Sequence, residues 1–289
     1  MTIRPRRSVL YMPASNVRAL EKARGIPADV LILDLEDAVA PDAKESARGQ
    51  ACAAVASGGY GGREMAIRIN GLGTPWIEAD IAAVAKAAPD AVVLPKTSAA
   101  GDVSQVIAAL RRAGAPAKLK LWAMIETPRG VLNAGKIAGA MPDGPACLIV
   151  GLNDLFKETR AEPDADRTAA QSWLAQIVLV ARAYGQDVLD SAYNNFRDAE
   201  GFRRECAQGR MLGFDGKTLI HPDQVAVANE VFAPPVAEVE WALKIIAAFE
   251  KPENKGKGVI NLEGRMVELL HAEMAKRTVA IAEAIKGRG

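Results

Sequence analysis

The sequence predicts a (β/α)8 barrel, or TIM barrel, followed by a C-terminal helical extension. Short apolar runs of strand-like composition alternate with longer amphipathic segments along residues 1–231, and this alternation is typical of parallel α/β proteins. Such a barrel takes about 250 residues. The chain has 289 residues, of which 49% are hydrophobic, enough for a core of that size. A doubly wound sheet is the alternative, because alternation alone does not show whether the sheet closes.

Eight segments have the length and apolar content of buried strands. Polar, glycine or proline residues follow each of them and mark its end. We expect strands at Ser8–Tyr11, Val30–Leu33, Met65–Ile69, Ala91–Leu94, Leu119–Ile125, Cys147–Val150, Asp187–Leu189 and Lys217–Ile220.

The segments between these strands have the character of helices. Ser15 precedes the first helix as a candidate N-cap, and Pro41 opens the second, as a proline at a helix N-terminus often does. We expect helices at Asn16–Arg24, Pro41–Val55, Trp76–Ala87, Val103–Ala113, Val131–Ala138, Arg167–Ala183, Phe196–Leu212 and Gln224–Val231.

The alternation ends near Phe232, where Ala233-Pro234-Pro235 interrupts the chain. We therefore assign residues 1–231 to the barrel and residues 232–289 to an extension that covers an active site, either its own or that of a neighbouring subunit. Within the extension we expect a helix at Val236–Phe249, a polar linker at Lys251–Gly258, a short hairpin at Val259–Gly264 and a final helix at Arg265–Ile285.

The composition excludes several classes of protein. A net charge of +1, with interleaved acids and bases, argues against binding to nucleic acid or to an anionic membrane. The three cysteines are widely spaced and form no CxxC pair, which argues against zinc and for a reduced compartment. We find no signal segment and no run long enough to span a membrane, and we expect a cytoplasmic protein.

Two acids follow successive predicted strands. Glu126 comes after Leu119–Ile125, and Asp154 comes shortly after Cys147–Val150. In parallel α/β proteins the carboxyl ends of the strands build the active site. Because the chain has only two histidines, these carboxylates predict a hard divalent cation with oxygen ligands, such as Mg²⁺.

Other polar residues follow the remaining strands and would join the same ring. Arg68 suits a substrate carboxylate, although an ordinary ion pair is the alternative. The acids after the second strand are either part of the site or caps of the next helix. Lys96 also allows a Schiff-base aldolase, and His221 allows a role in proton transfer or in orienting a loop. The full set is Asp34, Glu36, Asp37, Arg68, Asn70, Lys96, Asp190 and His221.

Several motifs, in order along nearly the whole chain, resemble those of the citrate lyase β-subunit-like (CitE-like) proteins. These proteins belong to the HpcH/HpaI aldolase superfamily, together with malyl-CoA, citramalyl-CoA and citryl-CoA lyases. The matching segments are Ser8–Asn16, Leu33–Lys44, Arg68–Gly71, Leu94–Lys96, Ile125–Gly130, Gly151–Leu155 and Gly213–Pro222.

The resemblance implies a TIM-barrel homo-oligomer, a trimer or a hexamer, that binds Mg²⁺ and a CoA thioester. Glu126 and Asp154 would be the metal ligands, and Glu126 would also bind the substrate. Arg68 would grip the carboxylate of a 2-oxo or hydroxy acid, and Glu36 and Asp37 would support the water shell of the metal.

The resemblance also implies roles for two residues outside that ring. Arg7 falls where the family contacts the CoA phosphates. Glu268 stands in the extension where several lyases have an aspartate, and it would act as the acid or base on the active site of a neighbouring subunit. One additional methylene changes the reach of this carboxylate by roughly 1.5 Å.

The implied reaction is Mg²⁺-dependent carbon–carbon cleavage, or formation, of a 3-hydroxyacyl-CoA, with an acyl-CoA and a 2-oxo acid on the other side. One alternative is a malyl-CoA-type thioesterase. A second is the β subunit of a citrate lyase complex acting on an acyl-carrier-protein thioester, and a third is a non-catalytic metabolite-binding protein.

Overall fold

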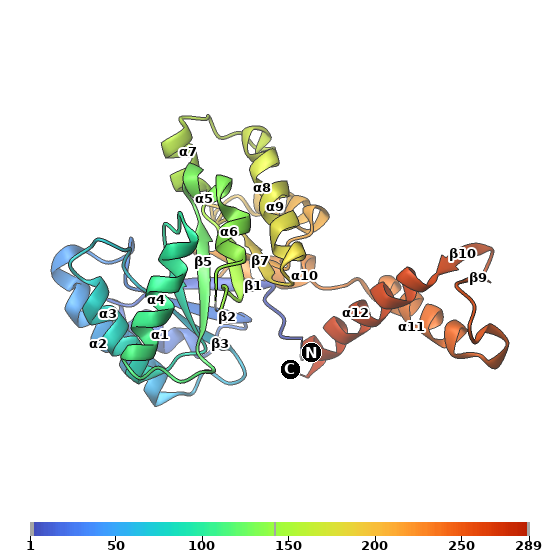
Figure 1. The fold of residues 1–289 in the computed structure, drawn as a ribbon, viewed down its shortest axis with the longest axis horizontal. Coiled ribbons are helices and arrows are strands. Elements are labelled where there is room, and N and C mark those ends of the chain that lie inside the picture. Colours follow the sequence, from blue (N-terminus) through green and yellow to red (C-terminus); the bar gives the residue numbers. More distant parts are fainter. Residues whose placement is uncertain (1–2, 142, 288–289) are drawn as a thin grey trace. The chain divides into compact units, whose positions relative to one another are not determined.

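Eight parallel strands close into a barrel in the computed structural model, which describes residues 3–141 and 143–287 (Figure 1). Neighbouring strands follow the order of the sequence, and β1 pairs with β8 through Val9 and Thr218. This pairing confirms the barrel over the doubly wound sheet. The strands are β1 (Ser8–Pro13), β2 (Val30–Asp34), β3 (Glu64–Arg68), β4 (Ala91–Leu94), β5 (Lys120–Ile125), β6 (Cys147–Val150), β7 (Asp187–Asp190) and β8 (Gly216–Leu219).

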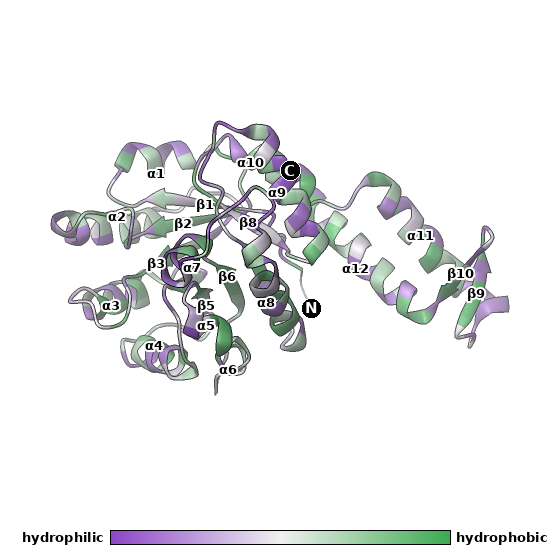
Figure 2. Ribbon diagram, turned by 90° about the horizontal axis from the view of Figure 1, so that it is seen from above, coloured by the Kyte–Doolittle hydropathy of each residue, from purple (hydrophilic) through white to green (hydrophobic). Residues whose placement is uncertain are grey.

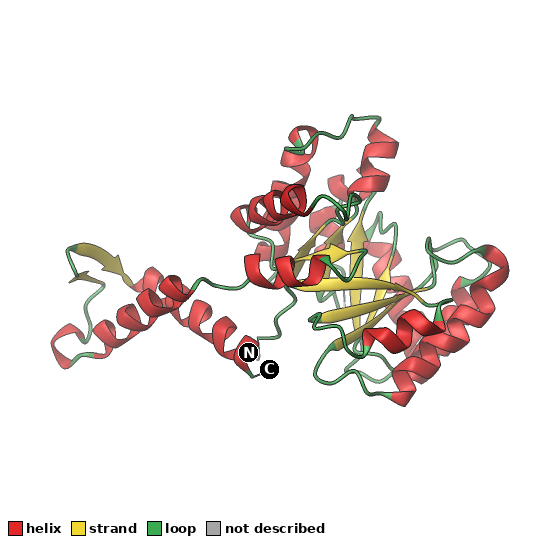
Figure 3. Ribbon diagram, turned by 180° about the vertical axis from the view of Figure 1, so that it is seen from behind, coloured by secondary structure: helices red, strands yellow, loops and turns green. Residues whose placement is uncertain are grey.

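Helices surround the strands (Figure 3). Most lie where the sequence predicts them, although two of the predicted helices begin with a 3-10 turn and one is divided into two pieces. They are α1 (Val17–Ala23), η1 (Pro41–Ala43), α2 (Lys44–Ser57), α3 (Ile77–Ala87), α4 (Ala100–Arg112), α5 (Pro128–Leu132), α6 (Ala134–Ala138), α7 (Leu152–Thr159), η2 (Thr168–Ala170), α8 (Gln171–Ala183), α9 (Ala199–Leu212) and α10 (Gln224–Val231).

The helix α7 was not predicted. It begins two residues after β6 and carries Asp154 in its first turn. Asp154 therefore lies at the N-terminus of a helix that directly follows the strand end.

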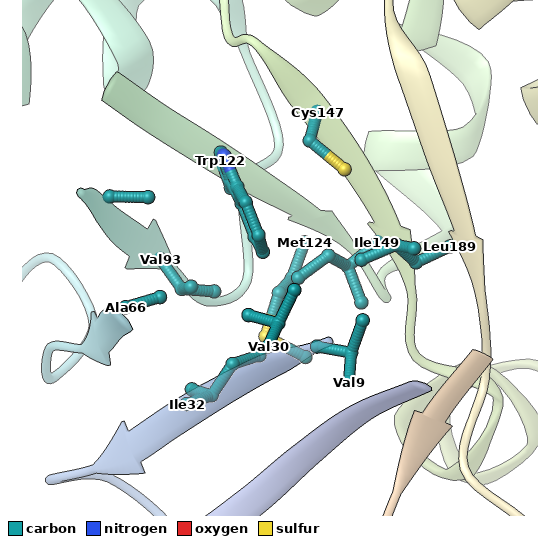
Figure 4. Packing of buried hydrophobic residues seen from close by; sticks show 11 residues of the cluster. Val9, Val30, Ile32, Ala66, Val93, Trp122, Met124, Cys147, Ile149 and Leu189 are labelled. Carbon is teal, nitrogen blue, oxygen red and sulfur yellow. The ribbon is translucent and has the colours of Figure 1, made fainter. Parts of the chain in front are cut away.

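The barrel interior is filled by side chains from alternate strand positions (Figure 4). Such alternation is required because successive side chains of a strand point to opposite faces. Trp122 and Met124 of β5, for example, point inward and are almost fully buried. The cluster comprises Val9, Val30, Ile32, Ala66, Ala91, Val93, Trp122, Met124, Cys147, Ile149 and Leu189.

The chain divides into two compact units. One is Arg6–Asn229, and the other contains the residues from Glu230 onward together with the short segment before Arg6. The elements of the second unit are α11 (Val236–Glu250), η3 (Pro252–Asn254), β9 (Val259–Leu262), β10 (Arg265–Glu268) and α12 (Leu269–Lys286).

The second unit has a core of its own. The helices α11 and α12 lie side by side, and each carries both apolar and polar residues (Figure 2). Ala242, Ile245 and Ala248 of α11 pack with Ala272 and Ala275 of α12. The predicted final helix at Arg265–Ile285 begins too early, because Arg265–Glu268 forms the second strand of the hairpin. Among the described residues, no helix combines the length and the apolar character needed to cross a membrane.

Candidate active site

The pairing of β2 with β3 places Asp34 beside Arg68 at the carboxyl ends of these strands. Arg68 donates from Nε and Nη2 to the two carboxylate oxygens of Asp34, both at 2.6 Å, and its guanidinium lies 4.8 Å from the centre of the Tyr11 ring. Burial alone would lower the pKa of Arg68, but its hydrogen bonds to Asp34 and its charge interactions with Tyr11, Asp34 and Glu36 together outweigh burial and raise it. The guanidinium of Arg68 is therefore charged, and its Nε and Nη2 atoms are held in place by Asp34.

The same carboxylate shapes the loop that follows β2. Asp34 accepts hydrogen bonds from the main-chain N–H groups of Glu36, at 2.9 Å, and of Ala38, at 3.0 Å. Such local bonds hold a turn without regular secondary structure. Asp34 therefore places Glu36 next to the remaining nitrogen of Arg68.

Two cations hold the acids of this loop. Glu36 Oε2 lies 3.0 Å from Arg68 Nη1, and Lys96 Nζ donates to Glu36 Oε1. The exposed Asp37 carboxylate lies 3.6 Å from the same two nitrogens. Burial raises the pKa of Glu36. It would also raise the pKa of Asp37, but the bond with Glu36 and the charges of Arg68 and Lys96 lower it. Lys96 therefore belongs to the site as an ion-pair partner.

Glu126 follows β5 and is only 3% exposed. Burial is the main cause that raises the pKa of its carboxyl to about 7, whereas the main-chain N–H of Lys96, which donates to Oε1 at 2.6 Å, lowers it. A nearby cation favours the ionised form of such a group. A cation at this site would therefore compete with a proton for the Glu126 carboxylate.

Asp154, which is half buried, lies close enough to Glu126 for its negative charge to raise the pKa of Glu126. Among residues 3–141 and 143–287, no three acidic, histidine or cysteine side chains form a metal-binding group. Two carboxylates fit Mg²⁺, because Mg²⁺ is usually held by one or two protein carboxylates with water and substrate oxygens. The predicted pair is a suitable donor set for this ion.

Arg7 does not lie with these residues. It precedes β1 and donates from Nε and Nη2 to Asp29, at 2.8 and 2.9 Å, just before β2 begins. Both residues are therefore at the amino ends of the strands, whereas the acids of the site are at the carboxyl ends. Its predicted contact with substrate finds no support in this placement, because a residue before a strand lies at the opposite end of the barrel.

Glu268 ends β10 and caps α12 in the C-terminal unit. Its main-chain N–H donates to His271 Nδ1 at 2.9 Å, whereas its carboxylate makes no capping hydrogen bond to the helix. This bond, from the N–H of the N-cap residue to the side chain three residues later, is one half of a capping box. The predicted acid–base role of Glu268 stays a prediction beside this structural one.

The other strand-end residues have contacts of their own. Asp190 is fully buried and bonds Arg167, at 2.7 Å, and Lys217, at 2.9 Å. The His221 ring stacks on Phe196 with a centroid distance of 4.5 Å. Asp190 is therefore part of an ion-pair network and does not join the predicted acids.

A cavity of about 420 Å³ adjoins the acids of the β2 loop. Its walls include the charged Glu36, Asp37 and Lys96 together with the indole of Trp76. Neither this cavity nor the contact between the amide of Lys96 and Glu126 could be predicted from the sequence, because both depend on how loops after different strands pack.

Comparisons with known proteins agree on one family. Residues 7–222 match the family model of HpcH/HpaI aldolase/citrate lyase. A (3S)-malyl-CoA thioesterase of Cereibacter sphaeroides is 49% identical over 281 residues, covering 97% of this chain and 96% of that protein. The citrate lyase subunit beta of Leuconostoc mesenteroides is 35% identical, covering 97% and 94%.

A similar solved structure is that of CitE from Mycobacterium tuberculosis in complex with magnesium, acetoacetate and coenzyme A. It is 30% identical, has a TM-score of 0.75, and the match covers 95% of this chain and 97% of that one.

Proposed function

Because the chain belongs to the HpcH/HpaI aldolase/citrate lyase family, as its motifs predicted, we propose that it acts on a 3-hydroxyacyl-CoA thioester such as malyl-CoA. The observation that carries this proposal is the position of Glu126, Asp154 and Arg68 around the carboxyl ends of β3, β5 and β6. Two carboxylates for a cation and one arginine for an anion form a site for a small acid that chelates Mg²⁺.

The favoured reaction is hydrolysis of the thioester. The resemblance of the motifs implies carbon–carbon cleavage, with the thioesterase as an alternative. Relatives named (3S)-malyl-CoA thioesterase are 47–49% identical to this chain, whereas relatives named citrate lyase subunit beta are 33–35% identical. In hydrolysis, water oxygen bonds to the thioester carbon, the C–S bond breaks, and the departing sulfur takes a proton. The carbon–carbon lyase reaction is the second candidate.

The residues of the chain would bind and orient the substrate. Glu126 and Asp154 would hold Mg²⁺, which supplies Lewis-acid polarisation of a substrate oxygen. Arg68 offers only Nη1 to a substrate carboxylate, because Asp34 occupies its other edge. The acids of the β2 loop, Glu36 and Asp37, would support water molecules around the cation.

We also propose that the extension completes the site of another copy in a homo-oligomer, where Glu268 would transfer a proton. Support comes from the apolar residues that flank Glu268. Met266 is 71% exposed, and Leu269 and Leu270 are each at least half exposed. A group of exposed apolar side chains is suited to burial against another protein surface.

A product assay tests the function. The purified chain alone is incubated with malyl-CoA, citramalyl-CoA or citryl-CoA, with Mg²⁺ or with EDTA. Hydrolysis of malyl-CoA gives malate and CoA, whereas carbon–carbon cleavage gives glyoxylate and acetyl-CoA. Turnover by the isolated chain would also exclude a strict need for a citrate lyase complex. Absence of turnover with all three thioesters would contradict the proposal.

A further inference from the structure

Lys96 has a left-handed backbone conformation, which glycine adopts readily and lysine rarely does. Its φ is +51°. Among the other described non-glycine residues with a positive φ, Ala88 and Arg160 end helices and Glu263 lies in the hairpin turn, where this conformation is common, and Arg167 (φ +54°) precedes the 3-10 turn η2. Lys96 instead follows Pro95 in a turn, at the place where glycine is preferred. Strain of this kind concentrates at functional sites.

The strained backbone directs the main-chain N–H of Lys96 at Glu126. The distance from this nitrogen to Glu126 Oε1 is 2.6 Å. Within the described part of the chain, it is the only hydrogen bond that the Glu126 carboxylate receives. One oxygen of a nearly buried carboxylate is therefore oriented by a peptide group, and Oε2 is left for another partner.

The side chain of Lys96 makes a separate contact. Its ammonium bonds Oε1 of Glu36, whose Oε2 lies 3.0 Å from Arg68 Nη1. Lys96 and Arg68 therefore share one carboxylate. Nη1 is the nitrogen of Arg68 that Asp34 does not occupy, so Glu36 and a substrate carboxylate would compete for it. Because the ammonium of Lys96 also attracts Glu36, it reduces that competition.

We propose that Lys96 is a positioning residue with two separable roles. Its main-chain amide orients Glu126 toward the cation, and its ammonium competes with Arg68 for Glu36, so that a substrate carboxylate can displace Glu36 from Nη1 of Arg68. The second role rests on the proposed function. The first requires only that Glu126 belongs to a cation site.

Three substitutions separate the roles. Lys96→Gly and Lys96→Met both remove the ammonium and keep the main-chain N–H, whereas Lys96→Arg restores a cation. Lys96→Gly should melt about 2–4 °C above Lys96→Met, because both lack the ammonium and glycine adopts a positive φ without strain. Lys96→Met keeps most of the aliphatic stem and controls for lost packing.

Calorimetry on the metal-free proteins measures the first role. The dissociation constant of Mg²⁺ should not rise by more than about threefold in Lys96→Gly or Lys96→Met, because the amide remains and a nearby positive charge is lost. In NMR spectra the amide proton of residue 96 should be shifted downfield, in Lys96→Gly as in the wild type, and Glu126→Ala should remove that shift. A tenfold weaker Mg²⁺ affinity in both Lys96 variants, or an amide signal indifferent to Glu126→Ala, would overturn this role.

Malate measures the second role, because it carries the carboxylate and hydroxyl groups of the proposed substrate and its binding needs no turnover. With saturating Mg²⁺, the dissociation constant of malate should rise at least about tenfold in Lys96→Gly and Lys96→Met and return to within about threefold in Lys96→Arg. The KM for malyl-CoA should follow the same order, with a smaller change in kcat.

A double variant distinguishes retention of Glu36 from direct attraction of the substrate. If Lys96 acts through Glu36, Lys96→Met combined with Glu36→Gln should bind malate within about threefold of the wild type. If the double variant binds malate as weakly as Lys96→Met, the second role is rejected. If the wild-type protein binds Mg²⁺ and malate but does not convert malyl-CoA, the proposed function is refuted. The two roles of Lys96 would still be decided by the binding measurements.

Discussion

Gly151 leaves the space that the Glu126 side chain occupies. A β carbon on residue 151 would lie 2.5 Å from both Cβ and Oε2 of Glu126. The φ of Gly151 is −116°, which any residue can adopt, so the requirement is for space alone. The start of α7, two residues after β6, is therefore packed directly against the predicted metal ligand.

Gly151→Ala should displace Glu126. We expect Mg²⁺ affinity to fall about 10–100-fold, as it does when the support of a metal ligand is lost, with a stability loss of about 1–3 kcal/mol from overpacking. Calorimetry and chemical denaturation measure the two effects. Gly135→Ala in α6 is the matched control, because a β carbon there meets nothing within 4 Å. It should leave Mg²⁺ affinity unchanged and stabilise the protein by up to about 1 kcal/mol.

Glu126→Gln and Asp154→Asn should each reduce Mg²⁺-dependent turnover more than about 100-fold while leaving the fold intact. Glutamine keeps an oxygen for the N–H of Lys96, so the loop after β4 should hold its position. Circular dichroism checks the fold, and product assays with Mg²⁺ or EDTA check the chemistry. Full activity of either variant in EDTA would refute the metal site.

The sequence predicted the barrel well because its strands are buried on both faces. Val30–Asp34 and Cys147–Val150 are buried at every position, so they read as continuous apolar runs. Helix α7 was missed because it starts almost directly after β6. A signal was present in Leu152 and Leu155, which are both buried and lie three residues apart, as on one face of a helix.

The grouping of residues at the strand ends could be predicted in part for a similar reason. Glu126 and Arg68 follow strands, and the barrel places strand ends together whatever the details of the loops. Arg7 precedes a strand, so the same rule places it at the opposite end, and the resemblance to the family obscured this signal. The conformation of Lys96 was beyond prediction, because the bond that it makes to Glu126 joins loops 30 residues apart.

Asp190→Asn should destabilise the barrel by about 3–5 kcal/mol, because it removes a charge that the buried Lys217 and Arg167 both need. Burial alone would raise the pKa of Asp190, but the charges of Lys217 and Arg167 outweigh it and lower the pKa below the usual 3.8. This stabilisation is therefore present above pH 3.8 and is lost as the pH falls through the folded-state pKa.

Denaturation at several pH values checks this prediction. Between pH 4 and pH 2 the stability of the wild type should fall more steeply than that of Asp190→Asn, because only the wild type must protonate this carboxylate. Parallel curves for the two proteins would show that other acids cause the whole loss.

Glu268→Gln should separate the capping role of Glu268 from proton transfer. The N–H of residue 268 that donates to His271 belongs to the main chain and is retained, so the free energy of unfolding should change by less than about 1 kcal/mol. Loss of the acid or base should lower kcat about 10²–10⁴-fold. Glu268→Asp keeps the same main-chain bond and a carboxylate, and its activity measures how much the shorter reach matters. Unchanged turnover in Glu268→Gln would leave capping as the role of this residue.

Mixing two inactive variants tests whether Glu268 acts on another copy. When Glu268→Gln and Glu126→Gln proteins are unfolded together and refolded as mixed oligomers, some sites combine an intact barrel with an intact extension from a neighbour. Random assembly of equal amounts should restore about a quarter of wild-type activity, because each of the two parts is intact in half of the copies. If Glu268 serves its own barrel, every copy contains one defect, and the mixture stays as inactive as its components.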